Sequence, residues 1–257
     1  MTRGTFSLVA ALAAASLGGC GAPRPERAAD NGQAPVDAGY VNAPAVLATV
    51  RMAGHVRLEG LAAPGSKVQL VTPAGDARVA AADREGRWRI DLPSAPEARM
   101  FGLSSVADGR RVQAQGYVLV TETGVATLLR AGVGSVVLAA SDSARLLSVD
   151  FDRQGGAVVS GTAPPDGSVS IRIDGRPGPV GRADGAGRFH LSLVQPLTAG
   201  RHEVRILGDN FDLDATIDST AAGDLGGAPF RTLRTSDGLR VDWLTPGGGL
   251  QSTWILN

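Results

Sequence analysis

The chain has little of the chemistry on which many enzymes and metal proteins depend. Its 257 residues include one cysteine, Cys20, so no internal disulfide can form and no cluster of thiolates can hold a metal. Only three histidines are present, His55, His190 and His202, and each falls within a predicted strand or at its end. The sequence contains no Gly-x-Ser-x-Gly elbow, no His-x-x-x-His pair and no phosphate-binding loop. We therefore expect a protein that is not an enzyme.

Net charge and long apolar runs are also missing. The 25 basic and 25 acidic side chains give a formal net charge of +0, so nothing favours a nucleic-acid partner. After residue 20 the longest apolar stretch runs from Leu128 to Ala140, and Arg130 interrupts it, so no membrane-spanning helix is expected. Aromatic residues make up 4% of the chain, whereas there are 35 glycines and 15 prolines. This composition favours short strands joined by tight turns, an all-β protein.

The first twenty residues have the pattern of an export signal. Arg3 provides a cationic start, and Phe6 to Leu17 forms an apolar run that is too short to span a bilayer. The segment Leu17-Gly18-Gly19-Cys20 resembles the lipobox of bacterial lipoproteins, in which the cysteine becomes the lipidated first residue. The resemblance implies a signal peptide over residues 1–19, acylation of Cys20, and a membrane partner reached through the lipid.

The residue after the cysteine bears on location. In lipoproteins of this kind an aspartate there signals retention in the inner membrane, and this chain has Gly21. We therefore expect a lipid anchor in the outer membrane, with the body facing either the periplasm or the cell surface. Residues 20–43 are rich in Pro, Ala, Asn, Asp and Gly and lack an apolar period, which predicts a flexible tether.

A duplication is the strongest pattern in the rest of the chain. When the sequence is shifted by 101 residues, Val56–Leu92 aligns without a gap on Ala157–Leu193, and ten of the 37 positions are identical. The identical pairs are Gly60/Gly161, Ala62/Ala163, Pro64/Pro165, Val68/Val169, Val79/Val180, Ala82/Ala183, Asp83/Asp184, Gly86/Gly187, Arg87/Arg188 and Leu92/Leu193. We predict two copies of one module, over residues 44–122 and 145–218.

Each copy has the strand and turn spacing of an antiparallel β-sandwich. The stretch from Asp83 to Trp88, repeated from Asp184 to Phe189, predicts a turn closed by Asp, a left-handed glycine and an aromatic side chain that enters the core. Two strands then close each copy, at 99–106 and 111–121 in the first and at 202–207 and 211–217 in the second.

This order resembles the bacterial immunoglobulin-like modules that occur in tandem in surface, adhesion and envelope proteins. The shared elements are Gly-x-Ala-x-Pro, an apolar strand, Asp-x-x-Gly-x-aromatic and two closing strands. The resemblance implies an all-β fold of two tandem immunoglobulin-like sandwiches. It transfers no binding residue, because the members of that family share no common site.

Two segments lie outside the duplication. Residues 123–144 join the modules and are too apolar for a free linker, so we expect them to pack against a sandwich and fix the angle between the modules. Residues 219–257 form a C-terminal extension in which alternating strands at 239–244 and 250–256 flank Pro246–Gly249, which predicts a β-hairpin.

Trp243 and Trp254 both lie on this hairpin. Because a lone hairpin is marginal in water, it must either dock on the second module or pair with a partner, for which an exposed tryptophan is a natural anchor. Trp243 and Trp254 are therefore the candidate partner-binding residues.

No cofactor is predicted, and calcium is the one metal that the carboxylates bring into consideration. Oxygen ligands could come from Asp209, Asn210, Asp212 and Asp214, or from Asp150 and Asp152 between the modules. A solvated strand face gives the same pattern, so no metal ligands are assigned.

The sequence thus predicts a non-catalytic, lipid-anchored envelope protein that acts as a spacer and protein-interaction scaffold at the outer membrane. Its partners would be other envelope or surface proteins, and exposed edge strands in both modules would suit partners that add a strand. The alternative is a glycan- or peptidoglycan-binding module. That function needs an aromatic platform, for which only Tyr117, Trp243 and Trp254 are candidates.

Overall fold

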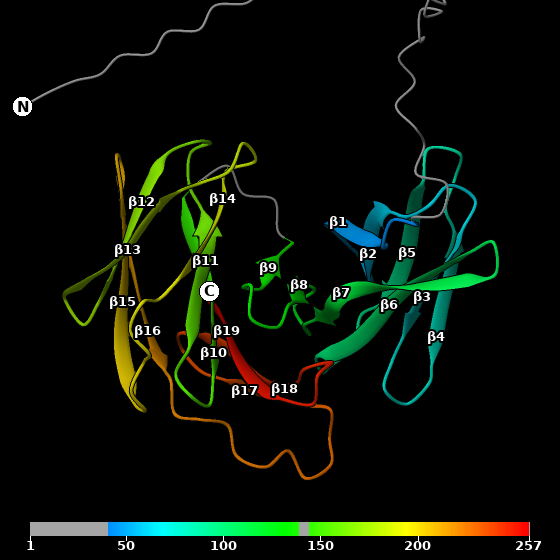
Figure 1. Cartoon of the computed structure of the whole chain (residues 1–257). Coiled ribbons are helices and arrows are strands. Elements are labelled where there is room, and N and C mark those ends of the chain that lie inside the picture. The colour runs from blue at the N-terminus through cyan, green and yellow to red at the C-terminus, as the bar shows by residue number, and fades with distance from the viewer. Residues whose placement is uncertain (1–40, 139–143, 257) are drawn as a thin grey trace, which may run out of the picture. The chain divides into compact units, whose positions relative to one another are not determined.

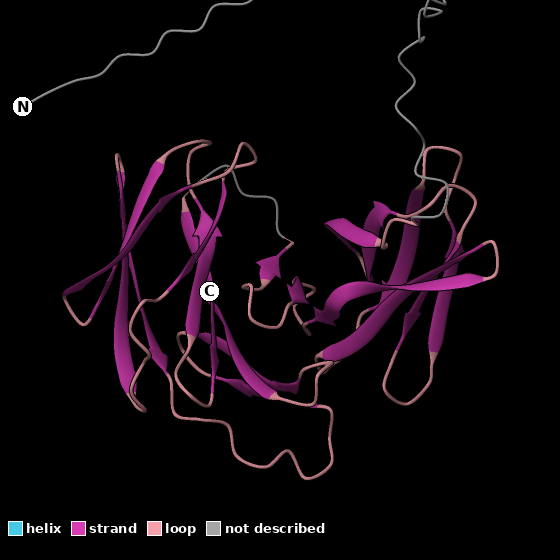
Figure 2. Ribbon diagram, viewed as in Figure 1, coloured by secondary structure: helices cyan, strands magenta, loops and turns pink. Residues whose placement is uncertain are grey.

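The computed structural model describes residues 41–138 and 144–256, which belong to one compact unit that begins at Val41. These residues form strands, turns and loops, and they contain no helix (Figures 1 and 2). The all-β fold class expected from the sequence is confirmed. Among the same residues there is no helix long and apolar enough to cross a membrane. The expected signal peptide, Cys20 and all but the last three residues of the expected tether lie outside the described residues.

The first module packs a three-stranded antiparallel sheet, in the order β1-β2-β5, against a six-stranded one in the order β4-β3-β6-β7-β8-β9. Leu58 and Trp88 from the smaller sheet and Leu103 from the larger one are among the side chains of the shared core. The strands are β1 Ala45–Met52, β2 His55–Leu61, β3 Lys67–Val71, β4 Ala77–Ala81, β5 Arg87–Pro93, β6 Arg99–Ala107, β7 Arg110–Val120, β8 Ala126–Leu129 and β9 Val136–Val137.

The second module packs a six-stranded antiparallel sheet, in the order β14-β11-β10-β19-β18-β17, against a four-stranded one in the order β13-β12-β15-β16. Its own core contains Val159 and Phe189 from the larger sheet and Ile206 from the smaller one. The strands are β10 Arg145–Asp152, β11 Ala157–Thr162, β12 Ser168–Ile173, β13 Arg176–Arg182, β14 Arg188–Ser192, β15 Arg201–Gly208, β16 Phe211–Asp218, β17 Phe230–Arg234, β18 Gly238–Leu244 and β19 Leu250–Leu256.

The repeated Asp-Gly-aromatic turn has the geometry that the sequence predicts. In the second copy the Oδ1 atom of Asp184 accepts hydrogen bonds from the backbone N–H of Ala186 at 2.9 Å and of Arg188 at 2.8 Å. The first copy repeats this pattern, with Oδ1 of Asp83 accepting bonds of 3.0 and 2.7 Å. The turn glycine of the second copy, Gly187, has a φ of 74°, which an L side chain rarely adopts.

The duplicated glycine of the second strand is explained by the aromatic residue that follows this turn. A Cβ atom on Gly161 would meet the carbonyl oxygen of Arg145 and the ring of Phe189, which is buried. In the first copy a Cβ atom on Gly60 would meet a backbone carbonyl oxygen and the ring of Trp88 in the same way. The missing side chain therefore lets the core aromatic lie directly against the neighbouring strand.

We expect Gly161→Ala to lower the free energy of unfolding by about 1–3 kcal/mol, because neither the backbone carbonyl nor the packed ring can move away cheaply. Urea denaturation of the purified protein measures the loss. Gly185→Ala is the matched control, since a Cβ atom there meets nothing within 4 Å, and its effect should stay within about 0.5 kcal/mol. Equal stability of the two variants would contradict this account of the repeat.

Candidate functional site

The C-terminal hairpin is present and completes the larger sheet of the second module. β18 and β19 pair in antiparallel register around the turn at 245–249, and β17 pairs with the other edge of β18. β19 in turn pairs with β10, from Ser148 opposite Ile255 to Asp152 opposite Gln251. Of the two arrangements that the sequence left open, docking on the second module is the one observed.

The hairpin is buried on both of its faces. Side chains along a strand alternate between the two sides of the sheet, so the hairpin has residues on both faces. Trp254 lies on the face that packs in the core of the second module. Trp243 lies on the other face, in a third core that it shares with Met100 of β6 and Leu119 of β7. In Figure 1 the red C-terminal strands lie next to β10 of the second module. The hairpin therefore forms a wall common to both modules.

Both candidate partner-binding residues are packed inside the protein. The exposed fraction is 0% for Trp243 and 3% for Trp254. Trp243 Nε1 donates to Thr253 Oγ1 at 3.1 Å, and Trp254 Nε1 donates to the carbonyl oxygen of Asp218 at 2.9 Å. Tyr117 packs edge-on against Trp243, with the ring centroids 5.9 Å apart. In this structure the two tryptophans hold the junction together, and neither ring presents an exposed face to a partner.

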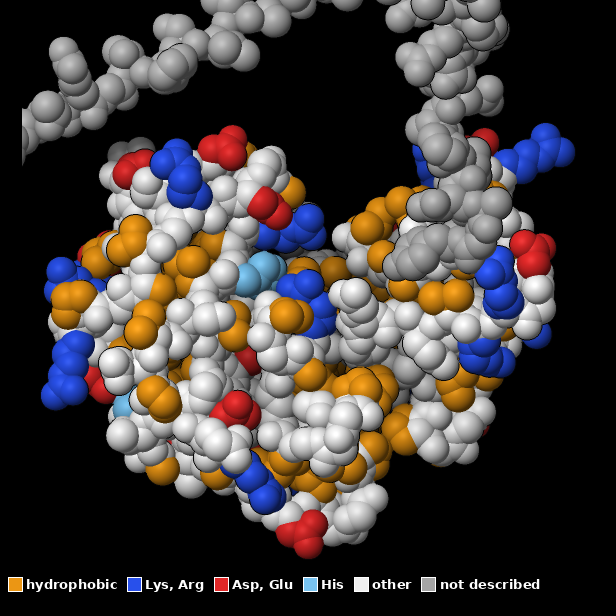
Figure 3. All heavy atoms as spheres, in the orientation of Figure 1, with side chains coloured by type: hydrophobic (Ala, Val, Ile, Leu, Met, Phe, Trp, Pro, Cys, Tyr) orange, Lys and Arg blue, Asp and Glu red, His pale blue; other side chains and the backbone are white. Residues whose placement is uncertain are grey.

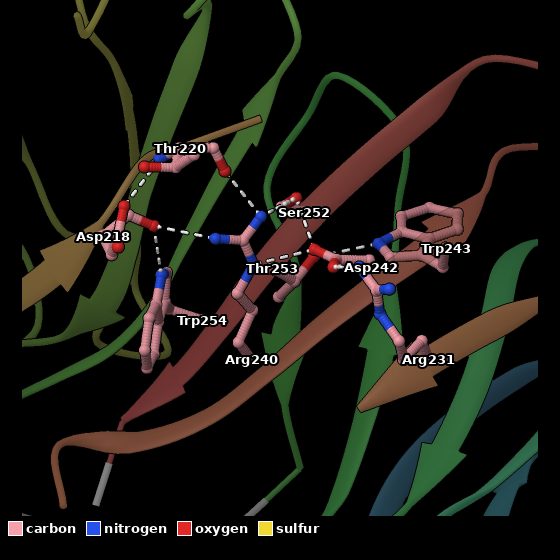
Figure 4. A network of polar contacts seen from close by, with 9 residues as sticks. All are labelled: Asp218, Thr220, Arg231, Arg240, Asp242, Trp243, Ser252, Thr253 and Trp254. Carbon is pink, nitrogen blue, oxygen red and sulfur yellow. Dashed lines mark hydrogen bonds and ion pairs between the residues drawn. The ribbon is translucent and has the colours of Figure 1, made fainter. Parts of the chain in front are cut away.

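Arg240, which forms a buried ion pair with Asp242 of its own strand, binds the hairpin to the preceding segment (Figure 4). Arg240 Nε donates to Asp242 Oδ1 at 2.8 Å, and its terminal nitrogens reach the carbonyl oxygens of Asp218 at 3.3 Å and Thr220 at 2.6 Å. Burial alone would raise the pKa of Asp242, but hydrogen bonds from Ser252, Arg240 and Arg231 hold it below the usual value. The carboxylate therefore stays charged, which satisfies the buried guanidinium beside it.

A second buried carboxylate connects three segments of the chain. Asp150 on β10 is 2% exposed and accepts hydrogen bonds from the backbone N–H of Ser135 at 2.7 Å and from the Ser135 hydroxyl at 2.6 Å. Its Oδ1 atom also accepts from Thr253 Oγ1 at 2.6 Å and Gln251 Nε2 at 3.2 Å. Burial raises the pKa of Asp150, and these four hydrogen bonds oppose the rise. The linker, β10 and the hairpin thus converge on one side chain.

The part of the inter-module segment that the structure describes up to residue 138 contacts both modules. β8 pairs with β7 and extends the larger sheet of the first module. The turn that follows contacts the second module: Gln251 Nε2 donates to the carbonyl oxygen of Arg130 at 3.3 Å, and its Oε1 accepts from the N–H of Gly132 at 3.2 Å. This turn is therefore bound to the shared wall.

Each of the three histidines has a protein neighbour, and His55, at the start of β2, has Nδ1 3.2 Å from the carbonyl oxygen of Ala53. His202 lies between Asp174 Oδ2 and the carbonyl oxygen of Thr198, each 2.7 Å away. His190 lies at the junction, with Nδ1 2.9 Å from Ser160 Oγ and Nε2 3.3 Å from a terminal nitrogen of Arg130. Neither of these two rings joins a hydroxyl to a carboxylate, because His190 contacts the Ser160 hydroxyl and His202 contacts the Asp174 carboxylate.

The carboxylates considered for calcium are engaged with protein groups or separated. Asp212 pairs with Arg205, and Asp150 is surrounded by hydrogen-bond donors, while Asp152 Oδ1 accepts from the backbone N–H of Gln154 and Gly156. Within residues 41–138 and 144–256, no group of three or more His, Cys, Asp or Glu side chains is placed to hold a metal ion.

A cleft of about 390 Å³ lies between the modules at this junction. One wall is the start of β1, from Leu47 to Thr49, and the other comes from β11 and β14, with Ser160 and His190. The 135–138 segment also lines it. On the face drawn in Figure 3 the charged side chains are scattered, and neither sign gathers into a patch. Ser160 Oγ, 2.9 Å from His190 Nδ1, lies in this cleft, and the other ring nitrogen of His190 faces Arg130 and not a carboxylate.

Replacing Trp243 should loosen the junction. Trp243→Ala removes a side chain that is 0% exposed from the core shared by both modules, so we expect it to lower the free energy of unfolding by about 3–5 kcal/mol. Denaturant titration gives the loss, and limited proteolysis should reveal earlier cleavage between the modules. Leu233→Ala is the control, because Leu233 is 58% exposed on β17 of the same sheet. An unchanged midpoint in Trp243→Ala would count against the shared wall.

The junction should also weaken in mild acid. Burial lowers the pKa of His190, and the neighbouring Arg130 and Arg188 lower it further. Because the pKa of His190 is lower in the folded protein, the unfolded chain binds the proton more readily. The contribution of neutral His190 to the free energy of unfolding is therefore complete above about pH 6.5 and declines as the pH falls below that value. We expect the wild type to lose more stability between pH 7.5 and pH 5.5 than His190→Asn, measured by denaturant titration. Parallel pH profiles for the two proteins would contradict this.

Comparisons with known proteins give only distant likenesses. No protein-family model and no curated protein sequence matches the chain. Among solved structures, it is similar to the central fibronectin-III array of RIM-binding protein, with 12% identity, 83% of this chain and 88% of that chain covered, and a TM-score of 0.28. It is also similar to the BSP domain of a biofilm-associated protein, with 13% identity, 72% of this chain and 30% of that chain covered, and a TM-score of 0.26. At these scores the likenesses carry no inference, and the fold class stands on the strands described above.

Proposed function

We propose that the protein is a non-catalytic, lipid-anchored envelope protein whose two joined sandwiches act as a spacer and interaction scaffold at the outer membrane. The observation that carries the proposal is the shared wall, in which Trp243 and Trp254 bury opposite faces of one hairpin in two different cores. Such a junction resists bending, because any rotation of one module exposes apolar surface. A body of this kind suits holding a partner at a set distance from an anchor.

The side chains at the junction support a role without catalysis. The hydrogen-bonding groups of Asp150, Asp242 and Arg240 are used in joining segments of the chain, and all three side chains are buried. His190, the histidine nearest the cleft, has its pKa lowered by burial and has no carboxylate hydrogen-bonded to it. It therefore lacks the orienting group that a general base needs.

The glycan-binding alternative is less favoured. It needs an exposed aromatic platform, and within the described part of the chain every Trp, Tyr and Phe side chain is buried or half-buried. Tyr117, the remaining candidate, packs against Trp243. A hollow of about 650 Å³ at the hairpin tip is lined by Asp152, Asp224 and several glycines but by no aromatic residue. A protein partner fits these surfaces better than a stacked sugar ring.

The anchor part of the proposal rests on the sequence pattern that ends at Cys20. Several acyl chains on one cysteine would hold the body far more firmly than a single chain does. The expected tether over residues 20–43 would let the body stand clear of the lipid.

Cys20→Ser tests the anchor directly. We expect the wild type, expressed from its full-length gene in a Gram-negative host, to be recovered with outer membranes and to carry acyl mass on its first mature residue. The variant should lose both properties, because serine cannot form the thioether. Membrane fractionation and mass spectrometry of the mature protein make the measurement. An unmodified thiol in mature wild-type protein would overturn the anchor.

Cross-linking in the same cells tests the scaffold, with sedimentation against purified cell wall as the second arm. Capture of the same envelope protein by wild type and by the Leu233→Ala control, together with no sedimentation, supports a protein scaffold. Sedimentation with cell wall and no cross-linked protein would favour the glycan-binding alternative.

A further inference from the structure

The two copies of the module differ at one sheet edge. β1 of the first copy and β10 of the second are equivalent, because Thr49 lies opposite Leu58 as Val149 lies opposite Val159. β10 pairs with β11 on one side and with β19 on the other. β1 pairs with β2, and among the described residues no strand pairs with its other side. Figure 1 shows β1 in blue at the margin of its sheet.

The backbone of this edge is oriented to receive a strand. The hairpin between β1 and β2 has a two-residue loop, closed by Met52 and His55. Pairs in an antiparallel ladder alternate between bonded and non-bonded, and the closing pair of such a loop is bonded. By this alternation, the backbone N–H and C=O groups of Met52 and Val50 form hydrogen bonds to β2. Those of Arg51 and Thr49 point to the open side of β1. Val149 and Phe151, their equivalents, are paired in this way with Trp254 and Ser252 of β19.

A β-bulge does not close the edge. Bulges often protect exposed edges from pairing, and β1 has one between Val46 and Ala48. The second copy has the same irregularity between Leu146 and Ser148, yet β19 pairs with β10 from Ser148 onward. The stretch of β1 that follows its bulge is therefore competent to pair in the same way.

The side chains of β1 define which strand would fit. On the outer face Val50 is 44% exposed and Met52 is 40% exposed, so apolar partner side chains would be buried there. On the core-facing side Arg51 replaces the Phe151 of the second copy and is exposed. None of the ion pairs among the described residues includes Arg51. A carboxylate opposite this position would form a cross-strand pair.

The cleft at Leu47–Thr49 favours a strand over a folded domain at that part of the β1 edge. Its volume is about 390 Å³, between Leu47–Thr49 on one side and residues of β11 and β14 on the other. An added strand lies only about 4.7–4.9 Å from its neighbour, so an extended segment needs little room beside β1. A second copy of this chain would have to bring a whole sandwich edge to the same place.

We propose that the open edge of β1, from Ala48 to Met52, binds an extended segment of another polypeptide that runs antiparallel to β1, with apolar residues on the Val50 face and an acidic residue opposite Arg51. The inference deepens the interaction role proposed above and rests on it. The first copy thus offers a partner the place that the second copy fills with β19.

The test uses the full mature chain and a synthetic capped peptide in which valine alternates with threonine around one central glutamate. A matched peptide carries lysine in place of the glutamate. We expect the glutamate peptide to bind at least about tenfold more tightly, because the lysine faces Arg51. Hydrogen exchange should show new protection at the amides of Thr49 and Arg51. Equal binding of both peptides, or protection confined to another sheet edge, would overturn the proposal.

Two substitutions at one position separate the backbone from the side chain. Arg51→Pro removes the outward N–H without touching the β1–β2 ladder, and it should abolish binding. Arg51→Lys keeps both the N–H and the charge and should bind as the wild type does. If Arg51→Pro fails to fold, Arg51→Glu replaces it, and this variant should prefer the lysine peptide. If Arg51→Glu still bound the glutamate peptide more tightly than the lysine peptide, the proposal would be wrong.

Analytical ultracentrifugation of the chain without peptide tests whether a second copy of this chain occupies the edge instead. We expect a monomer, whereas a dimer that Arg51→Pro dissolves would assign this edge to a second copy and overturn the proposal. These measurements require neither acylation nor a particular membrane. Their failure would therefore leave the anchor and spacer role standing, and loss of the anchor in cells would leave the peptide result unchanged.

Discussion

The sharing of one β-hairpin between two hydrophobic cores is the constraint on which the rest of this structure depends. A two-stranded hairpin is marginal by itself, but here strand alternation sends Trp254 into one core and Trp243 into another. Neither module can lose the hairpin without exposing a buried indole. The C-terminal residues thus complete a sheet of the second module and also cover a face of the first.

Directional polar contacts give this apolar wall a single arrangement. Asp150 receives hydrogen bonds from the linker and from β19, and Asp242 receives them from Arg240 and Ser252. Buried carboxylates are costly unless each is fully paired, so a shifted register would leave a charge without donors. Apolar packing supplies the stability of the junction, while these contacts select its geometry. This division of roles is what a rigid spacer requires.

The duplication has been used in two different ways. In the second copy, the first strand carries the core residues Val149 and Phe151 and is covered by β19. In the first copy, the equivalent positions are Thr49 and Arg51, and the side of the core is closed instead by Leu138, whose carbonyl oxygen accepts a 2.8 Å hydrogen bond from Thr49. One module therefore uses its edge for internal assembly. The other keeps its backbone groups available, which is where an interaction protein would engage a partner.

The sequence by itself determined the fold class, the duplicated turn at Asp83 and Asp184, and the existence of the C-terminal hairpin, because these follow from local rules of alternation and turn chemistry. It also indicated that residues 123–144 are too apolar to be free. Only the tertiary structure decided that Trp243 and Trp254 are buried on opposite faces and that Asp150 joins segments about a hundred residues apart in sequence. Alternation along a strand shows that two side chains point to opposite faces of the sheet. The segment that covers each face is set by packing between residues far apart in sequence, and no local pattern records that packing.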